Sequence, residues 1–335
     1  MPLLLIQHTR RLAGVLLMGM LLSGCASAWQ TKKLQADPPR YLPPVHELTQ
    51  TPFYPQEQYQ CGPAALATVL NHHALVVSPQ ELVPQVYLPA RQGSLQVEMT
   101  ATARRYGLLA YPLKPELAEL LKEVAAGNPV LVLQNLSFSW LPKWHYAVVV
   151  GYDLVNAEVV LRSGTTRRWI TSLAAFERTW ARANYWALVV VPPERIPVTA
   201  EPLRYLNAAL ELEQTHQLEA AYQAYQMATK RWPDTSQIWL ALGNAAYGRR
   251  QYRESVEAFI NTTRVEPANV TGWNNLAYAL LELGCPQQAK RAIACALELA
   301  PQDANIQDSQ KEIEARVSKR DHHLADCPDI RCPVP

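Results

Sequence analysis

Two residues of the 335-residue chain have the types and local settings of a thiol catalytic pair. Cys61 stands directly before a helical pattern of small and apolar residues (64–70), and the positive end of a helix dipole favours a thiolate. Gly62 would let a ligand backbone approach closely, and Pro63 suits a first helical turn. His145 begins an apolar run that predicts a buried strand, and an imidazole held at a strand end can face a thiol at a helix end. The pattern predicts nucleophilic Cys–His chemistry.

Helices and strands follow in the order expected of an α+β domain. Ser78-Pro79-Gln80-Glu81 is a capping box with proline at the first helical position. Further helices are predicted at Leu95–Arg105 and at Glu116–Ala126, which Gly127 ends. Later apolar runs predict buried strands at Val130–Leu133, His145–Val150, Val159–Leu161 and Trp186–Val191.

The motifs C-G-P-A-A-L (61–66) and H-Y-A-V-V-V-G-Y (145–152), with G-S-L-Q-V-E-M-T-A-T-A-R-R-Y-G-L (93–108) between them, resemble the C39 family of cysteine peptidases. The resemblance covers roughly residues 50–190. The best-known members of that family cut leader peptides from secreted peptides after a double glycine. The resemblance implies a papain-like α+β fold, Cys61 as nucleophile, His145 as general base and acid, and an upstream glutamine as oxyanion donor.

The glutamine is displaced from the family position. The family usually places it six residues before the cysteine, where this chain has Pro55. Gln56, five residues before Cys61, is therefore the best candidate, and Gln58 and Gln60 remain alternatives.

The third catalytic group also departs from the family pattern, which has an aspartate at the end of the strand after the histidine strand. A hairpin turn near Asp153–Ala157 would place Ser163 to Thr165 opposite His145, and no aspartate lies there. Asp153 itself would be roughly 25 Å from His145 along the strand and is interpreted as a turn residue. Ser163 or a backbone carbonyl is expected to orient the imidazole.

A 34-residue period marks the C-terminal part. The matched positions are Trp239 and Trp273, Leu242 and Leu276, Phe259 and Ile293, and Pro267 and Pro301, with a weaker earlier copy at Tyr205, Ala221, Tyr225 and Pro233. The period resembles the tetratricopeptide repeat, in which each unit is a pair of antiparallel helices. The sequence predicts an all-α domain of three repeats that recruits a peptide or protein partner.

The N-terminal residues resemble a bacterial lipoprotein signal. Arg10 and Arg11 precede an apolar run (12–22) that is too short to span a bilayer, and Leu-Ser-Gly-Cys follows at 22–25. The resemblance predicts lipidation of Cys25, and Ala26 after it is typical of lipoproteins sent to the outer membrane. We expect a lipid-anchored protein facing the periplasm.

The predicted organisation places the signal peptide at 1–24, a proline-rich extended tether at 25–45 and the C39-like peptidase domain at 46–192. A linker at 193–201, the three repeats at 202–311 and a polar tail at 312–335 follow.

The charge balance, the histidine pairs and the remaining cysteines bear on nucleic-acid binding, metal binding and disulfide formation. Without Arg10 and Arg11 the chain has 29 basic and 29 acidic residues, which argues against nucleic-acid binding. No cofactor is implied, and neither histidine pair (72–73 and 322–323) has the spacing of a metal site. Cys285 and Cys295 are interpreted as small apolar filling, and Cys327 and Cys332 as a small disulfide loop. Two disulfides among these four residues are also compatible with the sequence, which does not assign their pairing.

Three functions fit these features. The leading one is a lipid-anchored envelope cysteine peptidase whose repeats recruit its substrate or partner. The alternatives are a catalytically weak or inactive peptide-binding scaffold, which the absent aspartate supports, and a thiol hydrolase of cell-wall peptides.

The lipid anchor is tested at Cys25. Cys25→Ser should abolish labelling by radioactive fatty acid, because the thioether can form only on the thiol. Lipid remaining on the variant would contradict the anchor.

Overall fold

The computed structural model describes residues 28–56, 60–317 and 327–332. The predicted signal peptide, Cys25, Gln58 and the second histidine pair lie outside these ranges. The chain divides into two compact units, one made of residues up to 102 with 112–190, the other of residues 103–111 with 191–335. The break lies beside the linker predicted at 193–201, whereas the sequence assigned 103–111 to the first unit. Among the described residues, no helix is long and apolar enough to cross a membrane.

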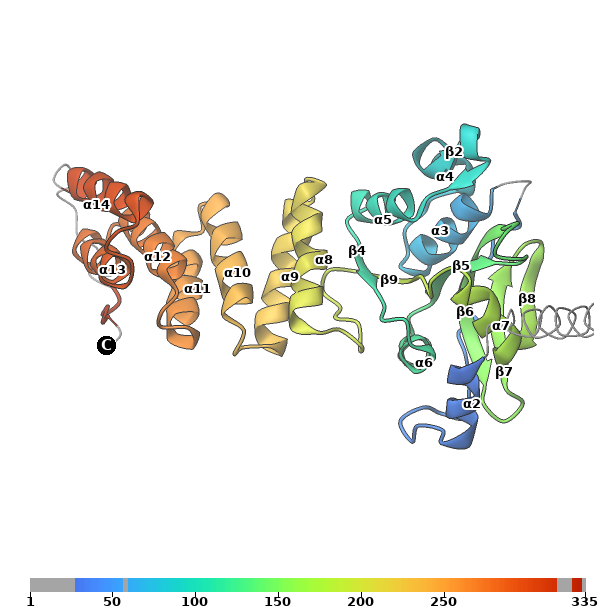
Figure 1. The fold of residues 1–335 in the computed structure, drawn as a ribbon. Helices are drawn as coiled ribbons and strands as arrows, with labels where there is room; N and C mark the ends of the chain where they lie inside the picture. The colour runs from blue at the N-terminus through green and yellow to red at the C-terminus, as the bar shows by residue number, and fades with distance from the viewer. Residues whose placement is uncertain (1–27, 57–59, 318–326, 333–335) are drawn as a thin grey trace, which may run out of the picture. The chain divides into compact units, whose positions relative to one another are not determined.

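One seven-stranded sheet has the order β4-β9-β5-β6-β7-β8, with β1 paired to β6 beside that path (Figure 1). Its strands are β1 (Val45–Glu47), β4 (Leu109–Pro112), β5 (Val130–Asn135), β6 (Trp144–Asp153), β7 (Glu158–Ser163), β8 (Thr166–Ser172) and β9 (Ala187–Val191). All four predicted strands are present, and β5 and β9 are buried along their whole length. Two short strands, β2 (Tyr87–Leu88) and β3 (Gly93–Ser94), form a separate ribbon.

Helices surround this sheet. They are α2 (Trp29–Ala36), α3 (Cys61–His72), α4 (Pro79–Val86), α5 (Gln96–Arg105), α6 (Leu117–Ala125), α7 (Leu173–Ala181) and the short 3-10 helix η1 (Pro89–Arg91). The capping box predicted at Ser78 is present, with both reciprocal hydrogen bonds to Glu81. The predicted α+β class of this domain is confirmed.

The prediction of an extended tether at 25–45 is wrong for residues 29–36, which form α2. The backbone N–H groups of Gln30 and Thr31 donate to the two carboxylate oxygens of Glu177 on α7, at 2.9 and 2.6 Å. The Gln30 side chain accepts from Leu117 N and donates to Pro115 O near the start of α6. A buried carboxylate at the positive end of a helix is stabilising, so tertiary contacts order a segment with little helical pattern of its own.

The second unit contains three consecutive helix pairs and a final helix (Figure 1). They are α8 (Pro202–Gln214) with α9 (Leu218–Arg231), α10 (Ser236–Gly248) with α11 (Tyr252–Val265), α12 (Val270–Leu283) with α13 (Pro286–Leu299), and α14 (Ala304–Val317). The 34-residue period has a hydrogen-bond counterpart. The indole N–H groups of Trp239 and Trp273 donate to the carbonyl oxygens of Pro233 and Pro267, at 2.7 and 2.9 Å. One period later the Gln307 side chain donates to Pro301 O at 2.9 Å.

The four C-terminal cysteines form two disulfides, Cys285–Cys327 and Cys295–Cys332. The interpretations of the first two as apolar filling and of the last two as a local loop are therefore wrong. Cysteines 42 and 37 residues apart are joined because the segment 327–332 folds back onto the last repeat, where Ile330 is buried in its core. The polar sequence of the predicted tail gave no indication that this segment packs against the repeat.

The two repeat tryptophans should differ in their contribution to stability. Trp273 is buried in the core around α12 and α13, whereas Trp239 is half-buried. Trp273→Ala should lower the free energy of unfolding by about 3–5 kcal/mol, the loss typical of a buried aromatic. Trp239→Ala is the matched comparison and should cost clearly less. Urea unfolding followed by far-UV circular dichroism measures both, and equal losses would contradict this packing.

Candidate active site

Cys61 is the first residue of α3, with Gln60 at its N-cap. Nine consecutive residues of α3, from 62 to 70, are buried, so the helix is fixed by packing. Gly62 makes room for a neighbour rather than for a ligand, because a Cβ there would lie 2.2 Å from Ser94 Oγ. The sequence-based role of Gly62 is thus corrected: the glycine allows β3 to pack against the start of α3.

Two of the predicted site residues meet at the backbone of Tyr146, the residue after His145. The backbone of Tyr146 acts on the Cys61 thiol in the direction that lowers its pKa, and the Gln56 side-chain amide donates to Tyr146 O at 3.4 Å. The Gln56 backbone N–H donates to Gly164 O at 3.1 Å, next to Ser163. The segment before α3 is thereby attached to β6 and to the turn that follows β7.

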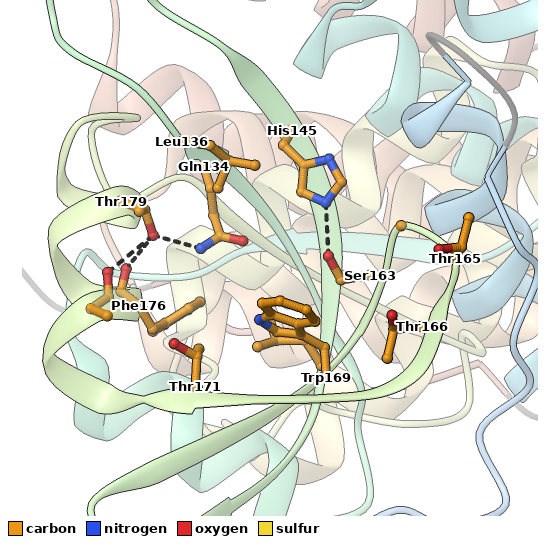
Figure 2. A pocket seen from close by; sticks show the side chains of 13 residues that line it. Gln134, Leu136, His145, Ser163, Thr165, Thr166, Trp169, Thr171, Phe176 and Thr179 are labelled. Carbon is orange, nitrogen blue, oxygen red and sulfur yellow. Dashed lines mark hydrogen bonds between the residues drawn. The ribbon is translucent and has the colours of Figure 1, made fainter.

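The imidazole of His145 is held by Ser163. A hydrogen bond of 2.8 Å joins His145 Nε2 to Ser163 Oγ (Figure 2). β6 and β7 are antiparallel and pair Asp153 with Glu158, so the hairpin turn lies where the sequence placed it. Asp153 is at that turn, where its carboxylate accepts hydrogen bonds from Asn156. The ring thus has a neutral hydroxyl partner where the family has a carboxylate.

The structure does not join the thiol to the imidazole. Among the described residues, no hydrogen bond links Cys61 to His145, and His145 Nδ1 has no partner. The side chains of a strand alternate between faces. Tyr146 extends toward α3 and donates to Ser94 O, whereas His145 lies beside Gln134 and the residues of α7. The two reactive groups therefore approach the same strand end from different sides.

Burial governs the ionisation of the thiol. Desolvation raises the pKa of Cys61 above its ordinary value, and the hydrogen bonds from the backbone of Tyr146 and Gly62 offset it only in part. This direction is opposite to the one expected from a helix N-terminus alone. At neutral pH this direction favours the protonated thiol.

The pKa of the His145 imidazole is shifted downward, whereas that of the Cys61 thiol is shifted upward. Burial lowers the pKa of His145 to about 4, and the nearby positive charge of Lys143 contributes in the same direction. Since Ser163 carries no charge, it cannot offset the desolvation of an imidazolium. His145 is consequently neutral, and able to accept a proton, at every pH well above 4.

Two supporting residues had no clear signal in the sequence. Arg162, next to Ser163, is buried, and its guanidinium donates to the carbonyl oxygens of Leu48, Thr49, Thr51 and Arg167. It thereby ties the chain that leads to Gln56 onto β7. Gln134 pairs with His145 across β5 and β6, and its side chain donates to Thr179 Oγ1 at 2.6 Å. The one sequence signal for each role was a polar side chain, Arg162 or Gln134, within an otherwise apolar strand.

The described residues contain no group of three His, Cys, Asp or Glu side chains able to hold a metal ion. The arrangement of Cys61, His145, Gln56 and Ser163 is suited to acyl transfer through sulfur.

Family comparison identifies both parts of the chain. Residues 48–188 match the Peptidase_C39 like family and residues 240–304 match the tetratricopeptide repeat family. The chain therefore contains a C39-like peptidase domain followed by tetratricopeptide repeats.

Three known proteins illustrate these similarities. A C39-like peptidase structure from Bacillus anthracis is 18% identical, covering 44% of this chain and 97% of that one, with a TM-score of 0.38. The structure of YrrB, described as a repeat protein with an unusual peptide-binding site, is 21% identical over 36% of this chain and 69% of its own, with a TM-score of 0.31. Superkiller protein 3 of Saccharomyces cerevisiae is 27% identical over 124 residues, 37% of this chain, which spans only 8% of that protein's length.

The partner of His145 should control its ionisation. Ser163→Asp would place a negative charge beside Nε2 and should raise the pKa of His145 by about 1–3 units. Ser163→Asn, which is neutral and of similar size, is the matched control and should leave the pKa near 4. NMR titration of the imidazole measures both variants. An equal pKa of His145 in Ser163→Asp and Ser163→Asn would show that charge at position 163 does not control the ionisation of the imidazole.

Proposed function

We propose that this protein is a cysteine peptidase that cleaves peptide bonds through Cys61 and His145. The observation that carries the proposal is that Cys61 and Gln56 lie at the backbone of Tyr146, the residue after His145, within a domain that matches the C39-like family. Hydrogen bonds between catalytic groups are often absent or long before substrate binds.

The reaction starts from the neutral pair. His145 accepts the thiol proton at Nδ1, since Nε2 is occupied by Ser163, and the Cys61 sulfur attacks the carbonyl carbon of the substrate. The carbon–nitrogen bond then breaks, and the leaving amine takes the proton from His145. Water, deprotonated by His145, hydrolyses the thioester and regenerates the thiol. The Gln56 amide would donate to the oxyanion once it releases Tyr146 O.

The proposed location is the cell envelope, with a lipid on Cys25 anchoring the chain in the outer membrane. Two disulfides support an oxidising compartment, because such bonds are rare in the cytosol. Only residues 26–28 separate Cys25 from α2, which is docked on the peptidase domain. Four residue steps span at most about 14 Å, so an anchored protein would hold this domain close to the lipid surface.

The repeats are proposed to bind a peptide or protein partner. Stacked helix pairs present an extended surface made by several units, which is the usual binding surface of such solenoids. This partner is either the substrate itself or a protein that delivers it.

Single substitutions at the site should separate an enzyme from an inert scaffold. Cys61→Ala should abolish turnover of a peptide mixture, and Gln56→Ala should lower it by about 10²–10³-fold if its amide binds the oxyanion. Asp153→Ala, at the exposed hairpin turn, is the control and should retain wild-type turnover. Turnover that persists in Cys61→Ala would contradict the mechanism, and no turnover in the wild type would favour the scaffold.

The dependence of activity on pH should reveal the protonation state of His145. Activity should be lost as the pH falls through about 4, because protonated His145 cannot accept the thiol proton. Steady-state kinetics should show this acidic limb at higher pH in Ser163→Asp. An acidic limb at the same pH in both proteins would contradict the assignment of His145 as the base.

A further inference from the structure

A pocket of about 420 Å³ lies beside His145, between α7 and the β7–β8 hairpin, and the imidazole forms part of its wall (Figure 2). Leu161 and Phe176 contribute buried apolar surface to it. Trp169 on β8 also lines it and is 51% exposed, so part of its indole surface is available to an occupant. The volume falls within the range of about 300–1,000 Å³ that is usual for small-ligand sites.

The chemistry of the lining favours a neutral, apolar occupant. None of the thirteen residues that line the pocket is Asp, Glu, Lys or Arg. The side-chain amide of Gln134 already donates to Thr179 Oγ1, so it does not require a ligand. A charged group placed here would lose hydration without gaining an oppositely charged partner, because the lining offers only neutral groups, among them hydroxyls of Ser163 and four threonines.

The position of the pocket beside His145 relates it to the substrate residue directly after the cleaved bond. In the proposed reaction His145 gives its proton to the leaving amine, so that amine must lie against the imidazole. The residue that carries the amine is the first one after the cleaved bond. Its side chain extends from the carbon beside that amine, and it is the substrate group that we assign to the pocket on the Ser163 side of the same ring.

We propose that this pocket selects peptides with a bulky apolar residue, aromatic or branched aliphatic, directly after the cleaved bond. The proposal rests on the peptidase function above and adds its substrate class. Trp169, Phe176 and Leu161 supply the selective surface, and Ala175 of α7 also lines the pocket.

The first experiment digests an unbiased peptide library with the full-length protein and identifies the new N-termini by mass spectrometry. Phe, Tyr, Trp, Leu and Ile should be enriched at the first position after the cut, and Asp, Glu, Lys and Arg depleted. Cleavage that depends on Cys61 but shows no such preference would overturn the pocket assignment while leaving the peptidase function intact.

Two matched variants locate the preference. Ala175→Phe should fill the pocket and lower kcat/KM roughly 10- to 100-fold for a peptide with Phe after the cut, the loss expected for one unburied aromatic side chain. The same variant should still cleave a peptide with Gly there. Ala174→Phe adds the same side chain one residue away, outside the pocket lining, and should leave the preference unchanged. Trp169→Ala, at an exposed site, should weaken the preference without affecting folding.

A binding measurement keeps the pocket testable without turnover. Phenylalaninamide resembles the leaving product, with an amine beside an apolar side chain. In the Cys61→Ala variant it should shift the indole NMR signal of Trp169, and glycinamide or aspartate amide should not. Ala175→Phe should abolish that shift. Binding without any turnover by the wild type would refute the peptidase function alone, whereas no selective binding would overturn the pocket.

Discussion

Backbone pairing between β6 and β7 places Ser163 against the His145 imidazole, and the other parts of the candidate site are arranged around that contact. The pairing shifts register between Val149 and Gly151. Gly151 is required there because a Cβ would lie 2.8 Å from the backbone oxygen of His46 on β1. Strand β1 and buried Arg162 then hold the segment that leads to Gln56 and α3. Sheet geometry, more than any single side chain, positions the site.

The electrostatic character of the site follows from replacing a carboxylate by a hydroxyl. Ser163 can orient the ring, but it provides no charge to stabilise an imidazolium in a buried position. Desolvation therefore keeps both His145 and Cys61 neutral, and the helix N-terminus does not reverse this for the thiol. In the proposed reaction, proton transfer would therefore accompany attack on the substrate.

Long-range contacts order both ends of the described chain. At the N-terminal end, Glu177 receives the first N–H groups of α2 and holds this helix on the peptidase domain. At the other end, two disulfides and buried Ile330 fasten the segment 327–332 to the last repeat. A repeat stack exposes apolar surface at its final unit unless something covers it, and this segment contributes to that cover.

The sequence by itself determined the α+β class, the buried strands, the capped helix at Ser78 and the 34-residue repeat, because periodic burial and capping are local patterns. It also indicated that Ser163 to Thr165 lie opposite His145, and a hydrogen bond joins Ser163 of that range to the ring. Only the tertiary structure decided the rest. Helix α2, the two disulfide pairings, the role of Gly62 beside Ser94 and the raised pKa of Cys61 each depend on what lies nearby in space. Contacts between distant segments leave no periodic trace in the chain, so local patterns could not have predicted them.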